Sequence, residues 1–183
     1  MLPYSGSLGN ISKGYSKKWI GWRVTMTLDE LRVELQDLSE SEVKTIHKLV
    51  QALKRTRMSP LAYIEEMMNF QSDGLDKERG VYVHRMLVTD ELKNRYKILH
   101  GGITATFIDT AMGSTVFQKF GLDRQAVTLD LNVRFLSPAK NGWLVADTEI
   151  IKSGRTIIIL ETKVRDDEGK LVASASGTFF QRQ

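Results

Sequence analysis

The apolar positions between residues 27 and 70 recur at spacings of three and four, which is typical of amphipathic helices. Capping-box signatures, in which Ser or Thr is followed three residues later by Glu, open at Thr27 and Ser39. A Ser-Pro pair at 59–60 marks a further start, because proline suits the first helical position. We expect two or three helices in this part of the chain.

Residues 100–120, HGGITATFIDTAMGSTVFQKF, have the pattern of one long helix of about five turns. Between residues 103 and 118 the only charged side chain is Asp109, and apolar residues occur most of the way around the helix. A helix of this kind is expected to be buried. The remaining stripe consists of Gly102, Thr106, Asp109 and Gly113.

The period falls to two on both sides of this helix, which indicates strands. The clearest alternation lies in 127–135, where every odd position is apolar, so Thr128 is predicted on the face turned away from the helix. Short links containing glycine or proline connect the later strands. One buried helix followed by four strands favours an α+β fold in which an antiparallel sheet wraps the helix. The predicted strands are 81–88, 127–135, 143–151, 156–165 and 171–180.

The chain has 183 residues, of which 42% are hydrophobic, enough for one well-packed domain with an extension. It contains no cysteine, which excludes disulfides, thiolate metal sites and a cysteine nucleophile. No apolar run approaches the roughly 18 residues of a spanning helix, and residues 1–25 lack the apolar core of a secretory signal. We therefore expect a cytoplasmic protein that does not enter a membrane.

The net charge of +4 comes entirely from the first 25 residues, which carry four bases and no acid. From residue 26 onward the basic and acidic side chains are equal in number, so the folded part is neutral overall. This distribution argues against nucleic-acid binding. We divide the chain into a flexible basic leader (1–26), a helical extension (27–58) and the main domain (59–183).

Gly101 and Gly102 stand at the predicted helix start, where amides lack partners within the helix and the dipole adds partial positive charge. Such amides can polarise a carbonyl or hold an oxyanion, although the pair could equally be a simple glycine turn. Asp109 lies roughly 11–14 Å further along the axis, so one helix cannot bring it to the same carbonyl. Cooperation would need a second copy across a two-fold axis; otherwise Asp109 is satisfied within the core.

Other chemistries find little support in the sequence. His100 adjoins the glycines, whereas His47 and His84 have no companions at metal-ligand spacing, so no metal site is expected. No phosphate-binding GxxxxGK[ST] loop, dinucleotide-binding GxGxxG turn or GxSxG nucleophile elbow is present.

Several motifs in order resemble the hotdog-fold acyl-CoA thioesterases of the phenylacetate-pathway (PaaI-like) type, over about residues 60–183. Two departures from the family pattern are the absence of a glycine between Asn94 and His100 and the helical extension before Pro60. The motifs that carry the resemblance are Asn94, His100-Gly101-Gly102, Asp109, Thr128, Ser137-Pro138-Ala139, Gly154-Arg155 and the closing segment 173–179.

The resemblance implies a long helix wrapped by an antiparallel sheet, dimers that pair edge to edge, and commonly a tetramer of two dimers. It implies that Asp109 is the general base or nucleophile and that Thr128 assists the attacking water. The amide that polarises the thioester carbonyl would come from Gly101 and Gly102, with Asn94 and His100 orienting water, carbonyl or leaving group. The segment implied to contact the nucleotide end of coenzyme A is Lys152, Ser153, Gly154, Arg155 and Thr156.

Three functions therefore remain open at this point. The first is hydrolysis of an acyl-CoA thioester, with coenzyme A entering only as part of the substrate and no other cofactor. The second is a non-catalytic acyl-CoA-binding regulatory module. The third is a hydratase or dehydratase on the same fold, although the histidine-bearing motifs of those families are not found.

Overall fold

The computed structural model describes residues 26–121 and 125–182, and the chain divides into two compact units, Met1–Val43 and Lys44–Gln183. The first unit contains α1 (Leu28–Glu34) and the start of α2 (Glu40–Arg55). The predicted capping box of α1 is confirmed, because the Glu30 amide donates to Thr27 Oγ1 (3.2 Å) and the Thr27 amide donates to Glu30 Oε2 (2.9 Å). The predicted leader falls almost wholly outside the described residues.

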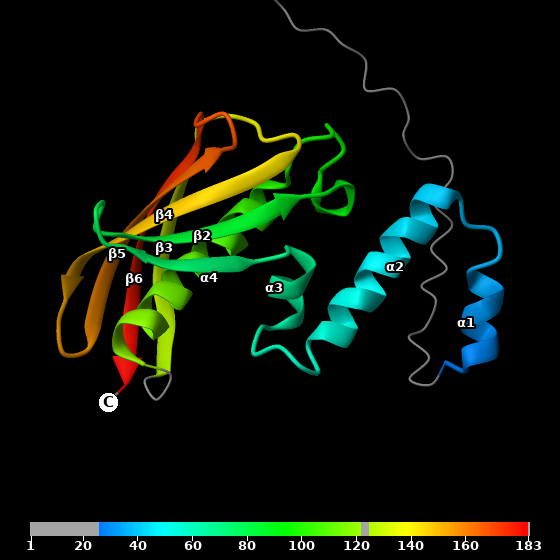
Figure 1. Cartoon of the computed structure of the whole chain (residues 1–183), viewed down its shortest axis with the longest axis horizontal. Helices are drawn as coiled ribbons and strands as arrows, with labels where there is room; N and C mark the ends of the chain where they lie inside the picture. The colour runs from blue at the N-terminus through cyan, green and yellow to red at the C-terminus, as the bar shows by residue number, and fades with distance from the viewer. Residues whose placement is uncertain (1–25, 122–124, 183) are drawn as a thin grey trace, which may run out of the picture. The chain divides into compact units, whose positions relative to one another are not determined.

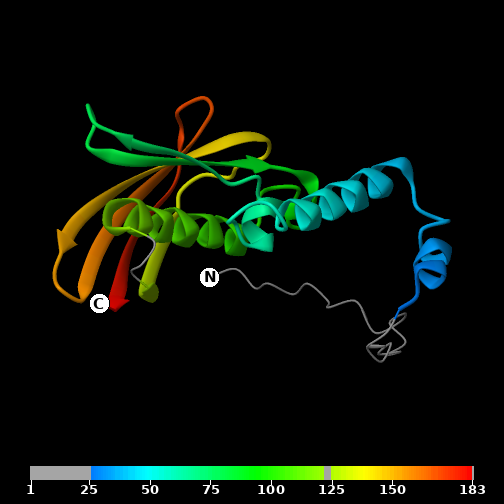
Figure 2. The ribbon, with the colours of Figure 1, turned by 60° about the horizontal axis from the view of Figure 1, so that its bottom comes forward.

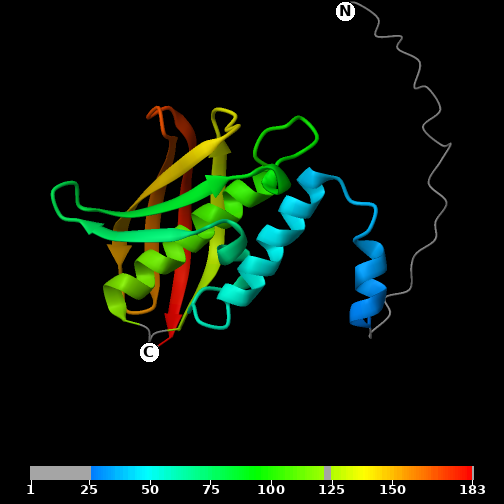
Figure 3. The ribbon, with the colours of Figure 1, turned by 45° about the vertical axis from the view of Figure 1, so that its right-hand side comes forward.

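The second unit contains the rest of α2 and one antiparallel sheet in the order β1-β2-β4-β5-β6-β3 (Figure 1). The sheet curls around α4, which runs along its concave side (Figures 2 and 3). This arrangement confirms the predicted α+β fold, with β1 as an additional strand. The elements are α3 (Tyr63–Met67), β1 (Gln71–Asp76), β2 (Val81–Val88), the 3-10 turn η1 (Asp90–Leu92), α4 (Gly101–Phe120), β3 (Gln125–Phe135), β4 (Gly142–Ser153), β5 (Ile157–Asp166) and β6 (Leu171–Arg182).

Helix α4 buries one stripe of side chains, at helical spacing, against the sheet. The predicted burial of this helix is confirmed on that side. The four residues of the remaining stripe are more open in the single chain: Gly102 is exposed, and Thr106, Asp109 and Gly113 are half-buried. The stripe of small residues thus lies on the open side of the helix. The buried residues of α4 are Thr104, Phe107, Ile108, Ala111, Met112, Thr115 and Val116.

Strand β3 contains a β-bulge that changes which side chains face α4. Thr128 pairs with Phe179 and Asp130 with Thr178, so Leu129 is an extra residue on β3. Because a one-residue shift exchanges the two faces of a strand, Leu131 packs toward the core beyond the bulge, whereas Leu129 is 59% exposed. The prediction that Thr128 faces away from the helix is therefore wrong.

Ion pairs within the second unit connect α2 to η1 and to α3. Lys48 Nζ pairs with Glu91 and donates to Thr89 Oγ1 (2.6 Å), while Arg55 Nε donates to Glu66 Oε2 (2.5 Å). Helix α3 begins at Tyr63 rather than at the Ser-Pro pair that predicted it.

Within the described ranges, no helix combines the length and apolar character needed to cross a membrane. The cytoplasmic location and the boundary at residues 58–59 stay predictions.

Candidate active site

Asp109 and Thr128 meet in the structure although 19 residues separate them in the sequence. Thr128 Oγ1 donates a hydrogen bond of 2.7 Å to Asp109 Oδ1. The bulge at Leu129 makes this contact possible by turning Thr128 toward α4. Asp109 is half-buried and Thr128 exposed, so the pair is open to a ligand. A carboxylate held by a hydroxyl has a fixed orientation, which suits general-base or nucleophilic chemistry.

The pair lines a cleft of about 770 Å³, within the size range of small-molecule sites. The open face of α4 forms its floor, from Asp109 to Gln118. One wall comes from the α3 and β1 region, and the other from the start of β3 and the end of β6, through Thr128 and Phe179. Three elements distant in sequence therefore surround the carboxylate.

The start of α4 forms a second group of candidate residues. His100 is the N-cap of the helix, and its Nδ1 accepts a hydrogen bond of 2.9 Å from the Gly102 amide. An accepting Nδ1 means that the neutral ring carries its proton on Nε2. The first amides of a helix lack partners within the helix, and the Gly102 amide is used by the cap. Of the predicted pair, the Gly101 amide is therefore the one left to meet a substrate carbonyl.

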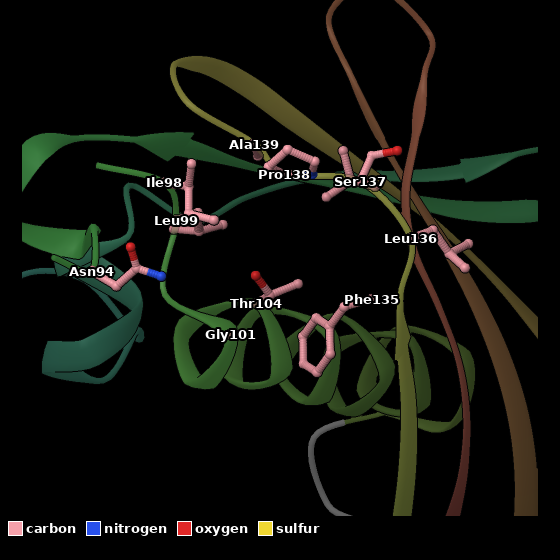
Figure 4. Close-up of a pocket in the computed structure, with 11 residues that line it drawn as sticks. Asn94, Ile98, Leu99, Gly101, Thr104, Phe135, Leu136, Ser137, Pro138 and Ala139 are labelled. Atoms are coloured by element: carbon pink, nitrogen blue, oxygen red, sulfur yellow. The ribbon is translucent and has the colours of Figure 1, made fainter. Parts of the chain in front are cut away.

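Asn94 lies in the loop that precedes this helix start. Its Oδ1 accepts from the Tyr96 amide (2.9 Å), so its side-chain nitrogen points the other way, toward the space in front of Gly101 and Thr104 (Figure 4). Asn94 and Gly101 both line a pocket of about 450 Å³ whose far side is formed by Phe135 and the loop after it. Asn94 and Gly101 therefore lie in one pocket.

The predicted site residues thus form two groups on one chain. Asp109 with Thr128 lines one cleft, and Asn94 with Gly101 lines another. Eight residues of helix separate Asp109 from Gly101, which corresponds to about 12 Å along the axis. A single chain therefore does not bring Asp109 together with Asn94 and Gly101.

The predicted coenzyme A segment is the turn between β4 and β5. Lys152 and Arg155 are exposed, and Gln181 Nε2 fixes the turn by donating to the carbonyl oxygens of Gly154 (3.0 Å) and Arg155 (3.3 Å). Gln181 follows Phe179 on β6 by two residues, so the turn lies beside the β3–β6 wall of the Asp109 cleft.

Sequence reasoning missed the wall that β1 contributes. Gln118 Nε2 donates to Ser72 Oγ (2.6 Å) and Ser114 Oγ (3.2 Å), which ties β1 to the end of α4. Strand β1 has the sequence QSDGLD, with a single apolar residue, so alternation could not reveal it. The turn-forming run Asp76 to Gly80 before β2 was the available signal for a hairpin.

A long helix held in a curled antiparallel sheet is the hotdog fold, and the half-buried carboxylate in mid-helix and the Gly101 amide at the helix start are the groups that a hydrolase of this fold would use. The model of the Thioesterase superfamily matches residues 96–173. Human acyl-coenzyme A thioesterase 13 is 31% identical over 103 residues, covering 54% of this chain and 71% of the relative.

Two solved structures share the fold. The BH2602 protein from Bacillus halodurans, solved with CoA, is 30% identical with a TM-score of 0.74, covering 85% of this chain and all of that one. The PaaI protein of Escherichia coli is 20% identical with a TM-score of 0.61, covering 75% and 95% of the two chains. The chain belongs to the thioesterase superfamily, and the resemblance to hotdog-fold thioesterases of the PaaI-like type is confirmed. It is a thioester hydrolase.

Proposed function

We propose that the protein hydrolyses an acyl-CoA thioester to a carboxylic acid and coenzyme A, with Asp109 of one subunit acting on a carbonyl bound by Asn94 and Gly101 of a second subunit. The observation that carries the proposal is the division of the site into two incomplete halves on one chain. Asp109 has its hydroxyl partner, Thr128, at 2.7 Å, yet Asn94 and Gly101, which would donate to the substrate carbonyl, line a separate pocket.

Two features support a homodimer. The open side of α4 carries small residues, Gly102, Thr106 and Gly113, that allow a second helix to approach closely. Two antiparallel copies of α4 would bring the middle of one helix toward the start of the other. Strand β3 is an edge of the sheet and spans 11 residues, so its free backbone groups can pair with a second β3. Assembly of two dimers into a tetramer stays a prediction.

In the proposed reaction, the thioester oxygen accepts hydrogen bonds from the Gly101 amide and the Asn94 side chain. Asp109 removes a proton from water, and the water oxygen attacks the carbonyl carbon. The tetrahedral intermediate then collapses with cleavage of the carbon–sulfur bond, and the coenzyme A thiolate takes up a proton. Alternatively, Asp109 attacks first and water hydrolyses the mixed anhydride. Thr128 donates to Asp109, so its oxygen can accept from the same water.

Coenzyme A as the leaving group is supported by the β4–β5 turn. Lys152 and Arg155 present two exposed cations on a backbone held by Gln181, and cations in this arrangement suit phosphate groups. The similar protein BH2602 was solved with CoA. No other cofactor and no metal enters this mechanism.

The first test is hydrolysis of a panel of acyl-CoAs by wild type and Asp109→Asn, with a thiol-detecting reagent that has no background because the chain lacks cysteine. Loss of a general base typically lowers the rate by roughly 10²–10⁴-fold. Asp130→Asn is the matched control, since Asp130 is an exposed acid on β3, two residues from Thr128, that lies on the opposite face of the strand. Equal activity in the two variants would refute the role of Asp109, and binding of acyl-CoA without turnover in wild type would favour the regulatory alternative.

The second test uses mixed dimers of Asp109→Asn and Asn94→Ala. If each site takes Asp109 from one subunit and Asn94 from the other, a mixed dimer has one site with both changes and one intact site. A fully exchanged equimolar mixture should then recover about a quarter of wild-type activity. Recovery of none, with exchange verified by differently tagged subunits, would place the site within one subunit.

A further inference from the structure

The α3–β1 segment supplies the wall of the Asp109 cleft that lies opposite the β3–β6 wall. Pro60, Leu61 and Phe70 line it on the apolar side. These residues precede the part of the chain that matches the superfamily model, 96–173. The match to the superfamily model therefore does not extend to this wall.

Phe70 is a rigid part of this wall. Its side chain is 6% exposed, stacked on His84 at 5.5 Å and edge-on to Phe107 at 6.3 Å between ring centroids. Leu61 is partly buried, packs against the same core, and lies in the short connection before α3. The wall thus has one fixed aromatic residue and one aliphatic residue at its margin.

Hydrogen bonds hold the segment at both ends. Arg55 donates from Nε to Glu66 Oε2 (2.5 Å) and from Nη2 to the Glu66 carbonyl oxygen (3.0 Å). Burial raises the pKa of Glu66, but hydrogen bonds from Arg55 and Ser59 outweigh it and lower the pKa, so the carboxylate is ionised at neutral pH. At the other end, the Leu87 amide donates to the Met68 carbonyl oxygen (3.1 Å).

The polar groups on this wall already have partners in the protein. Glu65 Oε2 accepts from the Ala62 amide (2.7 Å), Asp73 Oδ1 accepts from Arg85 Nη2 (2.7 Å), and Ser72 Oγ accepts from Gln118. A ligand that enters from the Asp109 side therefore meets the apolar side chains of Pro60, Leu61 and Phe70, next to polar groups that already have partners within the protein.

We propose that Leu61 and Phe70 bound the acyl group of the substrate and set the length of acyl chain that the enzyme prefers, which rests on the proposed acyl-CoA hydrolysis. For Asp109 to act, the thioester carbonyl must lie beside it. The cationic turn that suits coenzyme A borders the β3–β6 wall, so the acyl group takes the opposite, apolar wall. Leu61, partly buried in the connection before α3, is then the side chain that limits the length of the acyl group.

The experiment compares kcat/KM along a straight-chain series from acetyl-CoA to palmitoyl-CoA for wild type, Leu61→Ala and Leu61→Trp. Leu61→Ala should shift the preference toward longer chains and Leu61→Trp toward shorter ones. Because each methylene in an apolar pocket changes kcat/KM by roughly 10-fold or more, the long-to-short ratio should move at least about tenfold in opposite directions in the two variants. Ile64→Ala is the matched control, since Ile64 lies in the same segment but does not line the cleft.

The outcomes separate this inference from the proposed function. If wild type hydrolyses acyl-CoAs but Leu61→Ala has the wild-type chain preference, the inference is overturned and the proposed function stands. If wild type hydrolyses neither this series nor the acyl-CoA panel of the first test, the proposed function itself fails. Thermal unfolding identifies variants that are folded, and should Leu61→Trp not fold, Leu61→Ala alone decides the result.

Discussion

The buried imidazole of His84 makes the stability of the fold depend on pH in a way that can be calculated. His84 is fully buried on β2, and its Nε2 lies 3.0 Å from Thr115 Oγ1. Thr115 uses its own hydrogen to donate to the Ala111 carbonyl oxygen (2.9 Å), so its oxygen accepts from His84. The ring is therefore the neutral Nε2–H tautomer, and its buried Nδ1 has no hydrogen-bond partner among the described residues.

Burial lowers the pKa of His84 from 6.5 to about 4, with the charge of Asp73 opposing the shift. The unfolded chain binds a proton on His84 near pH 6.5, whereas the folded chain does so only near pH 4. The stability that this group contributes is fully present above the unfolded pKa of 6.5 and is lost as the pH falls from there toward the folded pKa of about 4. The free energy of unfolding should drop by about 2–3 kcal/mol between about pH 7 and about pH 4.5 from this residue alone.

The assay is urea denaturation of wild type and His84→Gln at both pH values and at one protein concentration. Glutamine keeps a donor for Thr115 but does not titrate, so the variant should show a pH dependence that is smaller than that of wild type by about 2–3 kcal/mol. Subtracting the two proteins removes the contribution of the carboxylates, which both share. An equal loss of stability on acidification in the two proteins would refute the assignment of a neutral, buried imidazole.

Three other predictions concern single contacts. His100→Ala should lower the free energy of unfolding by about 1 kcal/mol in urea because the cap of α4 is lost, whereas His100→Asn should restore it without restoring an imidazole; equal stability of the two variants would contradict the cap. Gly177→Ala should cost about 1–3 kcal/mol in the same assay, because the new methyl carbon would lie 2.5 Å from Met112 Sδ, and a neutral result would mean that Met112 moves freely. Arg55→Met should lower the free energy of unfolding by roughly 1–3 kcal/mol, seen as a lower melting temperature, because the Glu66 carboxylate stays buried without its cation. The loss should be smaller at a pH low enough to protonate Glu66.

The main elements of the fold could be predicted because their patterns are local. The capping boxes at Thr27 and Ser39, the apolar helix 100–120 and the alternating strands after it each carry their signal within a few residues. Strand β1 could not be predicted in this way, because it is an edge strand whose sequence QSDGLD gains its place from pairing with β2. Pairing partners do not show in the pattern of a strand.

The candidate site was only partly accessible to sequence reasoning. Residue types and spacing were enough to nominate Asp109 and the glycines, and the axial separation was enough to predict that they can cooperate only across two copies of the chain. Thr128 was predicted on the wrong face of its strand. The alternation of apolar and polar residues runs through Leu129 without a break, whereas the backbone pairing skips that residue. The hydrogen bond from the Gly102 amide to His100 could not be predicted either, because it depends on the rotamer of the His100 side chain.

The extra residue on β3 has a consequence for how this family tolerates changes in length. Deleting Leu129 would leave Thr128 paired with Phe179 and Asp130 with Thr178, now as consecutive residues of a regular ladder, so Thr128 would keep its place beside α4. The carboxylate would then keep its hydroxyl partner although the strand was one residue shorter. Relatives that lack this extra residue can accordingly hold their helix acid with a hydroxyl at the same place on the strand.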